Sequence, residues 1–181
     1  IRLQILQSPA IRDMLSGVGN PMELTAPAKR KCAYFIAMSD QDSTFQLASS
    51  LFFSFLFIDL AAFGKTQPNQ DLPVHINVVL DELPSIGQIP DLGRKMATVR
   101  KYGVNVFPIV QMVSQLDNRY SEAERDEIIG CCDTQIWLGS NDITSAQMLV
   151  DRAGTMTINS STKSHSLTES KGQISNTDGK R

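Results

Sequence analysis

The sequence predicts an α/β fold in which a mostly parallel sheet carries helices on both faces. Segments rich in apolar and β-branched residues alternate along the chain with segments of helical periodicity. One of them, residues 75–80, is apolar enough to be a strand buried on both faces of a parallel sheet. Polar side chains follow several predicted strands, and open α/β sheets bind ligands at that edge.

The composition favours a soluble domain in a reducing compartment. The 181 residues suffice for one compact domain with a core. A net charge of −2 and a pI near 5.7 exclude a general electrostatic attraction to nucleic acid or to an anionic membrane. Cys32, Cys131 and Cys132 form neither a disulfide framework nor a zinc pattern, which favours the cytoplasm. The chain begins at Ile1 without a signal peptide, so we expect a piece of a longer protein.

The sequence before residue 64 predicts one strand and two helices, one short and one long. A short helix at 11–15 precedes a buried strand at 32–38, and a helix follows from about residue 43 to residue 63. The long helix is unusually apolar. Its short length, its three serines and Asp59 favour a helix buried in the core over a membrane span.

The tripeptide at 64–66, Gly-Lys-Thr, imitates the end of a phosphate-binding loop. The pattern GxxxxGK[ST] would need glycine at position 59, where Asp59 stands. The tripeptide also follows a helix instead of joining a strand to a helix. We therefore interpret residues 64–71 as a loop, and no phosphate-binding loop occurs elsewhere in this chain.

The second half of the chain continues the alternation of strands and helices. Pro90 and Gly103 bracket a helix at about 90–102, and Ser121 with Glu124 forms a capping box for a helix that stops at Gly130. Pro108 is unfavourable in the strand that we predict at 104–110, because proline has no N–H group to donate to a β-ladder. The remaining predicted elements are a loop at 83–90, a strand at 134–138, a helix from 142 to 153, a last strand at 155–159 and a polar segment after residue 160.

Asp81 and Glu82 directly follow the strand at 75–80, and Gln111 follows the next predicted strand. An earlier strand leads to Asp40 and Asp42. This is the pattern of a Walker B strand, in which the first acid holds Mg²⁺ and the second orients the water that attacks a γ-phosphate. The glutamine amide can sense that phosphate. The alternative is a buried strand that ends at a polar turn, with a glutamine that only forms the turn.

The same region resembles the TraG/TraD family of type IV secretion coupling proteins. The resemblance is carried by VLDELPSIGQIP at 79–90, ATVRKYG at 97–103 and QMVSQL at 111–116. Shorter matches lie at 38–40, 43–44, 132–134, 138–142 and 154–157, so that the resemblance covers about residues 30–160.

The resemblance implies a hexameric, RecA-like ATPase at the cytoplasmic face of the bacterial cell membrane. Such a protein uses ATP and Mg²⁺ and links a relaxase–DNA complex, with its single-stranded DNA, to the proteins of a secretion channel. By this resemblance, Asp81 is the Mg²⁺-binding acid, Glu82 the catalytic carboxylate and Gln111 the sensor. Arg100 falls where the family has an arginine that acts at the neighbouring subunit's nucleotide. A plain surface role for Arg100 stays open.

The family's phosphate-binding loop and transmembrane helices are not in this sequence, so we expect this chain to be inactive alone. We divide it into a lead-in at 1–30, which the resemblance allows to contain the end of a helical insertion, the Walker B half of a RecA-like domain at 31–160, and a tail at 161–181 that we expect to be disordered. One alternative function is a non-catalytic docking module for relaxase, accessory or channel proteins. Another is a nucleotide-binding α/β protein outside secretion.

Overall fold

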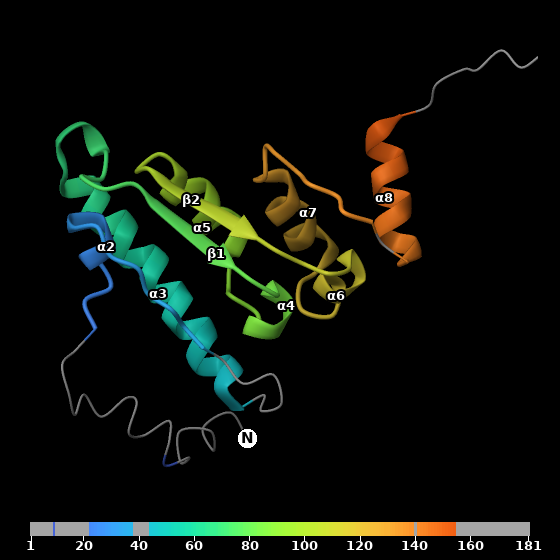
Figure 1. Ribbon diagram of the computed structural model, residues 1–181, viewed down its shortest axis with the longest axis horizontal. Helices are drawn as coiled ribbons and strands as arrows, with labels where there is room; N and C mark the ends of the chain where they lie inside the picture. Colours follow the sequence, from blue (N-terminus) through green and yellow to red (C-terminus); the bar gives the residue numbers. More distant parts are fainter. Residues whose placement is uncertain (1–8, 10–21, 38–43, 140, 155–181) are drawn as a thin grey trace, which may run out of the picture.

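The computed structural model describes residues 9, 22–37, 44–139 and 141–154 (Figure 1). It consists of helices and one small parallel sheet of two strands among the described residues, which is compatible with the predicted α/β class. The elements in chain order are α2 (Ala26–Lys29), α3 (Thr44–Thr66), the 3₁₀ turn η2 (Pro68–Gln70), β1 (Ile76–Leu80), α4 (Leu83–Ile86), α5 (Leu92–Arg100), β2 (Val104–Pro108), α6 (Val113–Asp117), α7 (Glu122–Gly130) and α8 (Ile143–Ala153).

The two strands pair in parallel, in a register that runs from Ile76 opposite Val104 to Leu80 opposite Pro108. Parallel neighbours need a crossover connection, and α5 supplies it. Pro108 has no N–H group, yet the ladder continues past it because the Ile109 N–H donates to the Leu80 carbonyl at 3.0 Å. The predicted strands at 75–80 and 104–110 are thus confirmed, each slightly shorter than expected.

The two faces of this sheet differ sharply. Val78, Leu80 and Val104 point into the core and are at most 7% exposed. The alternate residues face outward, and among them Val79 is 58% and Phe107 49% exposed. A parallel sheet is normally covered on both faces. Within the described residues, helices cover one face of it and leave the other open.

Helix α3 packs one side against the core and exposes apolar residues on the other. Phe57 and Leu60 are buried, whereas Phe55 is 54% and Ile58 50% exposed. The prediction of a core helix therefore holds for one side of α3. By length and composition alone, the part from Phe45 to Thr66 could cross a membrane, a property that core helices of soluble proteins share. The Ser50 hydroxyl donates to the Gln88 carbonyl, which ties α3 to the loop after α4.

One core joins α3, α5 and the inner face of the sheet. Tyr102 is fully buried, and its side chain lies against Gly64 near the end of α3. Burial of this apolar surface stabilises the fold by roughly 25 cal/mol for each Å² removed from water. The core residues are Phe53, Leu56, Phe57, Leu60, Ala61, Leu72, Val78, Leu80, Leu83, Ile86, Ile89, Leu92, Met96, Val99, Tyr102, Val104, Leu116, Tyr120 and Ile128, together with Ala28.

Two predicted strands are wrong in this structure. Residues 32–37 and 134–138 are not in a β-ladder, and the sheet among the described residues has two strands. An extended segment becomes a strand only when its backbone groups find partners, and neither segment has a neighbouring strand to supply them. Apolar composition alone was therefore not sufficient to predict the pairing.

The predicted helices agree with the structure better than the predicted strands do. Ser121 and Glu124 form the predicted capping box of α7, and the Asp142 side chain accepts a hydrogen bond at the start of α8. The region 83–90, predicted as a loop, instead contains α4, and α6 was not predicted. Each is a short turn without a helical apolar stripe of its own. Other predictions lie outside the described residues: the helix at 11–15, Asp40 and Asp42, the strand at 155–159 and the tail at 161–181.

Candidate site at the carboxyl ends of the strands

Asp81 and Glu82 lie directly after β1, at its carboxyl end. Asp81 is exposed and Glu82 is half-buried. Glu82 has φ 50° and ψ 54°, a left-handed conformation that costs a non-glycine residue about 1 kcal/mol or more. The surrounding backbone holds it there, because the Leu83 N–H donates to the Ile109 carbonyl at 3.0 Å. Strain of this kind clusters at functional sites.

Gln111 joins the acid pair from the neighbouring strand. It follows β2, and its Nε2 donates a hydrogen bond to Oε1 of Glu82. Because the two strands are parallel, their carboxyl ends meet at one rim, as the sequence pattern predicted. The structure therefore brings together Asp81, Glu82 and Gln111 in the chain itself, without a second copy.

Arg100 does not belong to this cluster. It ends α5, next to the start of β2, so it lies at the opposite end of the strands from the acid pair. Five strand residues separate these ends, which is roughly 16 Å at about 3.3 Å per residue. Its Nη2 pairs with Oδ2 of Asp133 at 2.6 Å, and 63% of the Arg100 side chain is exposed. Within one chain Arg100 therefore lies away from the acid pair.

The sequence by itself does not indicate Asp133 as the partner of Arg100. The two residues are 33 positions apart, and no periodicity or motif connects them. The short match at 132–134 was the one available signal, since it includes Asp133.

The residues at the rim suit a magnesium ion that is shared with a phosphate. Within the residues that the structure describes, no group of three or more His, Cys, Asp or Glu side chains could hold a metal ion. A Mg²⁺ ion in ATPase sites needs less, because one or two carboxylates and the substrate phosphates complete its octahedral shell. The exposed Asp81 carboxylate, with Glu82 next to it, meets that lower requirement.

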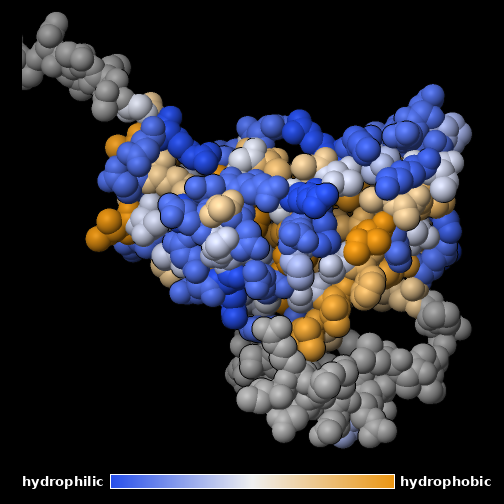
Figure 2. All heavy atoms as spheres, turned by 180° about the vertical axis from the view of Figure 1, so that it is seen from behind, coloured by the Kyte–Doolittle hydropathy of each residue, from blue (hydrophilic) through white to orange (hydrophobic). Residues whose placement is uncertain are grey.

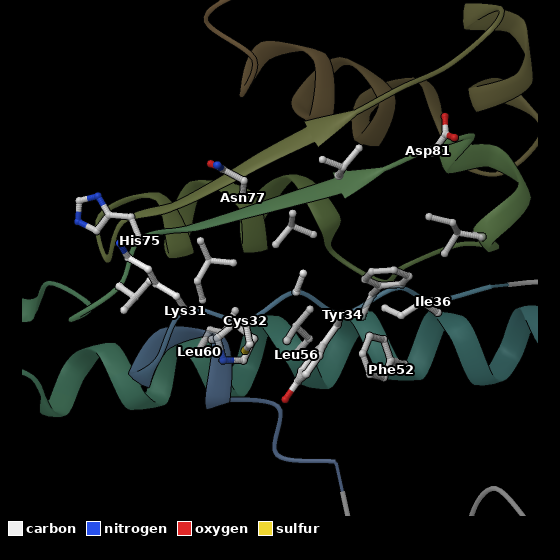
Figure 3. Close-up of a pocket in the computed structure, with 18 residues that line it drawn as sticks. Lys31, Cys32, Tyr34, Ile36, Phe52, Leu56, Leu60, His75, Asn77 and Asp81 are labelled. Atoms are coloured by element: carbon white, nitrogen blue, oxygen red, sulfur yellow. The ribbon is translucent and has the colours of Figure 1, made fainter.

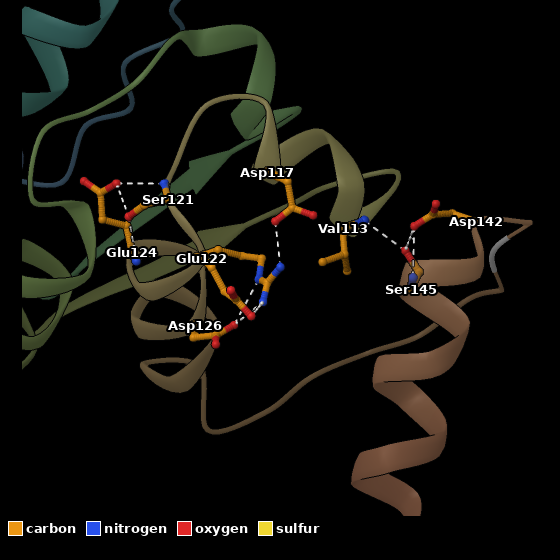
Figure 4. A network of polar contacts seen from close by, with 9 residues as sticks. Val113, Asp117, Ser121, Glu122, Glu124, Asp126, Asp142 and Ser145 are labelled. Atoms are coloured by element: carbon orange, nitrogen blue, oxygen red, sulfur yellow. Dashed lines mark hydrogen bonds and ion pairs between the residues drawn. The ribbon is translucent and has the colours of Figure 1, made fainter.

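A polar network stabilises the segment just after Gln111 (Figure 4). The hydroxyl of Ser145 accepts a hydrogen bond from the Val113 N–H at 2.9 Å and donates one to Asp142 at 2.7 Å. Ser145 is 2% exposed, so it links the first turn of α6 to the start of α8 in a nearly water-free position. These bonds from Ser145 lower the pKa of the Asp142 carboxyl. The backbone two residues after Gln111 is thus tied to α8, which is distant in sequence.

A second cluster in Figure 4 holds α7 in place. The Arg125 guanidinium, 13% exposed, contacts Asp117 at 2.7 Å and Asp126 at 2.8 Å. The hydrogen bonds with Asp126 and Asp117 raise the pKa of Arg125 above its ordinary value. The cluster connects the end of α6 to α7, and so supports the same segment from the other side.

A hollow lies elsewhere, between β1, α3 and residues 31–36 (Figure 3). Its volume is about 560 Å³, and its walls are mostly apolar. Asp81 lies at one end of it, whereas Glu82 and Gln111 do not line it. A hollow with these walls does not suit a triphosphate, so the rim and not this hollow is the candidate site.

Comparison with known proteins agrees with the rim motifs. Residues 75–181 match the family model described as "TraM recognition site of TraD and TraG". The chain is 31% identical over 104 residues to the conjugal transfer protein TraG of Escherichia coli. That match spans 57% of this chain and 16% of the relative. No solved structure matches. Because the family model covers more than half of the chain and includes the whole rim, this chain belongs to the TraG/TraD family of conjugal transfer coupling proteins.

Proposed function

We propose that the full-length protein is an ATP-hydrolysing coupling protein of a conjugative type IV secretion system. It would link a relaxase–DNA complex to the secretion channel, from the cytoplasmic face of the membrane. The observation that carries the proposal is the contact between Gln111 and Glu82 beside Asp81, at one rim of a parallel strand pair. Family membership supplies the context of conjugation.

Each rim residue has a distinct role in this proposal. Asp81 holds Mg²⁺, which neutralises charge on the phosphates when it is bound. Glu82 accepts a proton from the attacking water. Gln111 hydrogen-bonds Glu82 in this structure, and the same amide can turn to a γ-phosphate. Loss of that phosphate would therefore change the Gln111 contact and shift α6, which begins two residues later.

Arg100 acts in a ring of identical subunits. Its position at the far end of the strands excludes it from the rim of its own chain, and its exposure leaves it accessible to a neighbour. An arginine supplied across an interface can raise turnover by roughly 10³–10⁵. Hexameric assembly would create that interface.

The test is ATP turnover by the full-length protein, with and without single-stranded DNA. We expect Glu82→Gln to lower turnover by roughly 100-fold or more while ATP still binds, because loss of a general base has that effect. Asp81→Asn should weaken Mg²⁺-dependent binding itself. Glu122→Gln is the matched control, since that side chain is 84% exposed on α7, and it should leave turnover unchanged. Unchanged turnover in Glu82→Gln would contradict the motor function.

A second candidate is a docking function, which the family description favours. The matching model is named for recognition of TraM, which suggests that this region contacts a relaxosome component. If the full-length protein binds purified TraM-type partner but does not hydrolyse ATP under any condition, docking is its function. Both functions can also belong to one protein, in which case Glu82→Gln would abolish turnover and leave partner binding intact.

A further inference from the structure

Two adjacent residues between α6 and α7 hold the two ends of the segment that follows Glu82. Nε of Arg119 donates a hydrogen bond to the Pro84 carbonyl at 3.1 Å, and the Tyr120 hydroxyl accepts one from the Ile89 N–H at 3.1 Å. Tyr120 is 4% exposed, so its bond is buried, whereas the Arg119 side chain lies at the surface. The segment, which contains most of α4, is thus fixed at both ends from one short connection.

The Pro84 carbonyl needs a hydrogen-bond donor from outside α4. In a longer helix it would accept from the N–H four residues later, but α4 ends at Ile86, and Gly87 has left the helical conformation with φ 94°. Pro84 is buried, and a buried carbonyl without a donor destabilises the fold. Arg119 supplies the missing donor.

Arg119 contributes a donor atom here and not an ion pair. Among the residues that the structure describes, its guanidinium makes the bond to Pro84 and contacts no carboxylate. Arg125, only six positions later, lies among three carboxylates instead. The position of Nε is therefore the feature of Arg119 that this contact uses.

The connection that carries Arg119 also joins the two parts of the rim. Glu82 lies directly before α4, and Gln111 lies two residues before α6, which ends at Asp117. The contact between Gln111 and Glu82 at the rim and the bond between Arg119 and Pro84 behind it therefore close one ring of contacts. Because Glu82 has a left-handed conformation, the backbone around it must be held in place.

We propose that Arg119 is a positioning residue for Glu82, and that it acts through the Pro84 carbonyl. The proposal rests on the ATPase function proposed above, in which Glu82 accepts a proton from the attacking water. Arg119 touches neither the nucleotide nor the water in this role. It fixes the backbone after Glu82 and so limits the directions in which the carboxylate can point. Misplacement of a catalytic group by about 1 Å can lower turnover by about 100-fold.

Two substitutions at position 119 separate the donor from the charge. Glutamine carries an N–H₂ group at the same number of bonds from Cα as Nε of arginine, whereas methionine is of similar length and has no donor. In the full-length protein we expect Arg119→Met to lower kcat for ATP hydrolysis by roughly 10- to 100-fold with little change in KM. Arg119→Gln should keep most of the turnover.

Arg152→Met is the matched control, because Arg152 is exposed near the end of α8, and it should leave kcat unchanged. Hydrophilic side chains cover much of the surface seen in Figure 2, so one added methionine leaves the surface polar. An equal loss of kcat in Arg119→Met and Arg119→Gln would show that the charge matters, against the proposal. A rise in KM instead would indicate direct contact with the nucleotide, and natural turnover in Arg119→Met would also overturn the proposal.

Amide hydrogen exchange tests the contact without ATP. In full-length Arg119→Met, the Leu83 amide should exchange roughly 3- to 10-fold faster than in the natural protein, because one lost hydrogen bond eases local opening of α4. The Ile109 N–H, which donates to Leu80 in the ladder, is the control and should not change. Unchanged exchange at Leu83 would overturn the proposal even if turnover falls. If the natural full-length protein hydrolyses no ATP, the positioning role fails together with the proposed function, whereas faster exchange would still show that Arg119 holds this segment.

Discussion

Gly64→Ala gives a stability prediction whose sign depends on one contact. In a helix interior, alanine is favoured over glycine by about 1 kcal/mol. At Gly64 in α3, however, a Cβ atom would lie 2.6 Å from Cγ and 2.9 Å from Cβ of Tyr102. Tyr102 is fully buried, and its Cβ position is set by the backbone, so it cannot retreat cheaply. Overpacking of this kind costs about 1–3 kcal/mol. After the helix preference of about 1 kcal/mol for alanine is subtracted, we expect a net destabilisation of up to about 2 kcal/mol.

Urea unfolding measures this difference. With a typical slope of about 2 kcal/mol per molar urea, the midpoint should fall by up to about 1 M. Gly130→Ala is the matched control, because nothing lies within 4 Å of the added Cβ at the end of α7, and it should be neutral or slightly stabilising. In a Tyr102→Ala background, Gly64→Ala should cost less than in the natural protein. A stability equal to or above the natural protein in Gly64→Ala would refute the packing of Tyr102 against α3.

Three further predictions concern buried and capping groups. Ser145→Ala should destabilise the protein by about 1–3 kcal/mol in urea unfolding, because the Val113 N–H loses its acceptor in a buried position; no change would refute that bond. The Ser121 N–H and hydroxyl donate to the Glu124 carboxylate and lower its pKa, so the contribution of Glu124 to stability is present above pH 4.5, its ordinary pKa, and is lost as pH falls through the lowered pKa. The difference in unfolding free energy between the natural protein and Glu124→Gln, measured across pH, should therefore shrink as pH falls below 4.5. A difference that grows instead would contradict the cap. Tyr102→Phe should leave stability unchanged or raise it by about 1 kcal/mol, since the hydroxyl is buried with no hydrogen-bond partner among the described residues; a clear loss in the same assay would indicate a partner for it.

The rim could be predicted from the sequence because each of its parts is local. An apolar run that ends in Asp81 and Glu82, and a second that leads to Gln111, place these side chains at strand ends, and parallel pairing then brings the ends together. The conformation of Glu82 had no such signal. Its positive φ follows from backbone bonds to a residue after β2, which the sequence does not display.

The sequence by itself determined strands β1 and β2, the ends of α7 and α8, and which polar residues follow the strands. These features depend on side-chain period and on caps within a few residues, so local chemistry is sufficient. The tertiary structure alone decided that 134–138 joins no β-ladder among the described residues, that Arg100 binds Asp133 at the far end of the sheet, and that Ser145 supports the segment after Gln111. Each of these depends on a partner that is remote in the chain, and an extended or polar segment has no preference among remote partners until the core has brought them together.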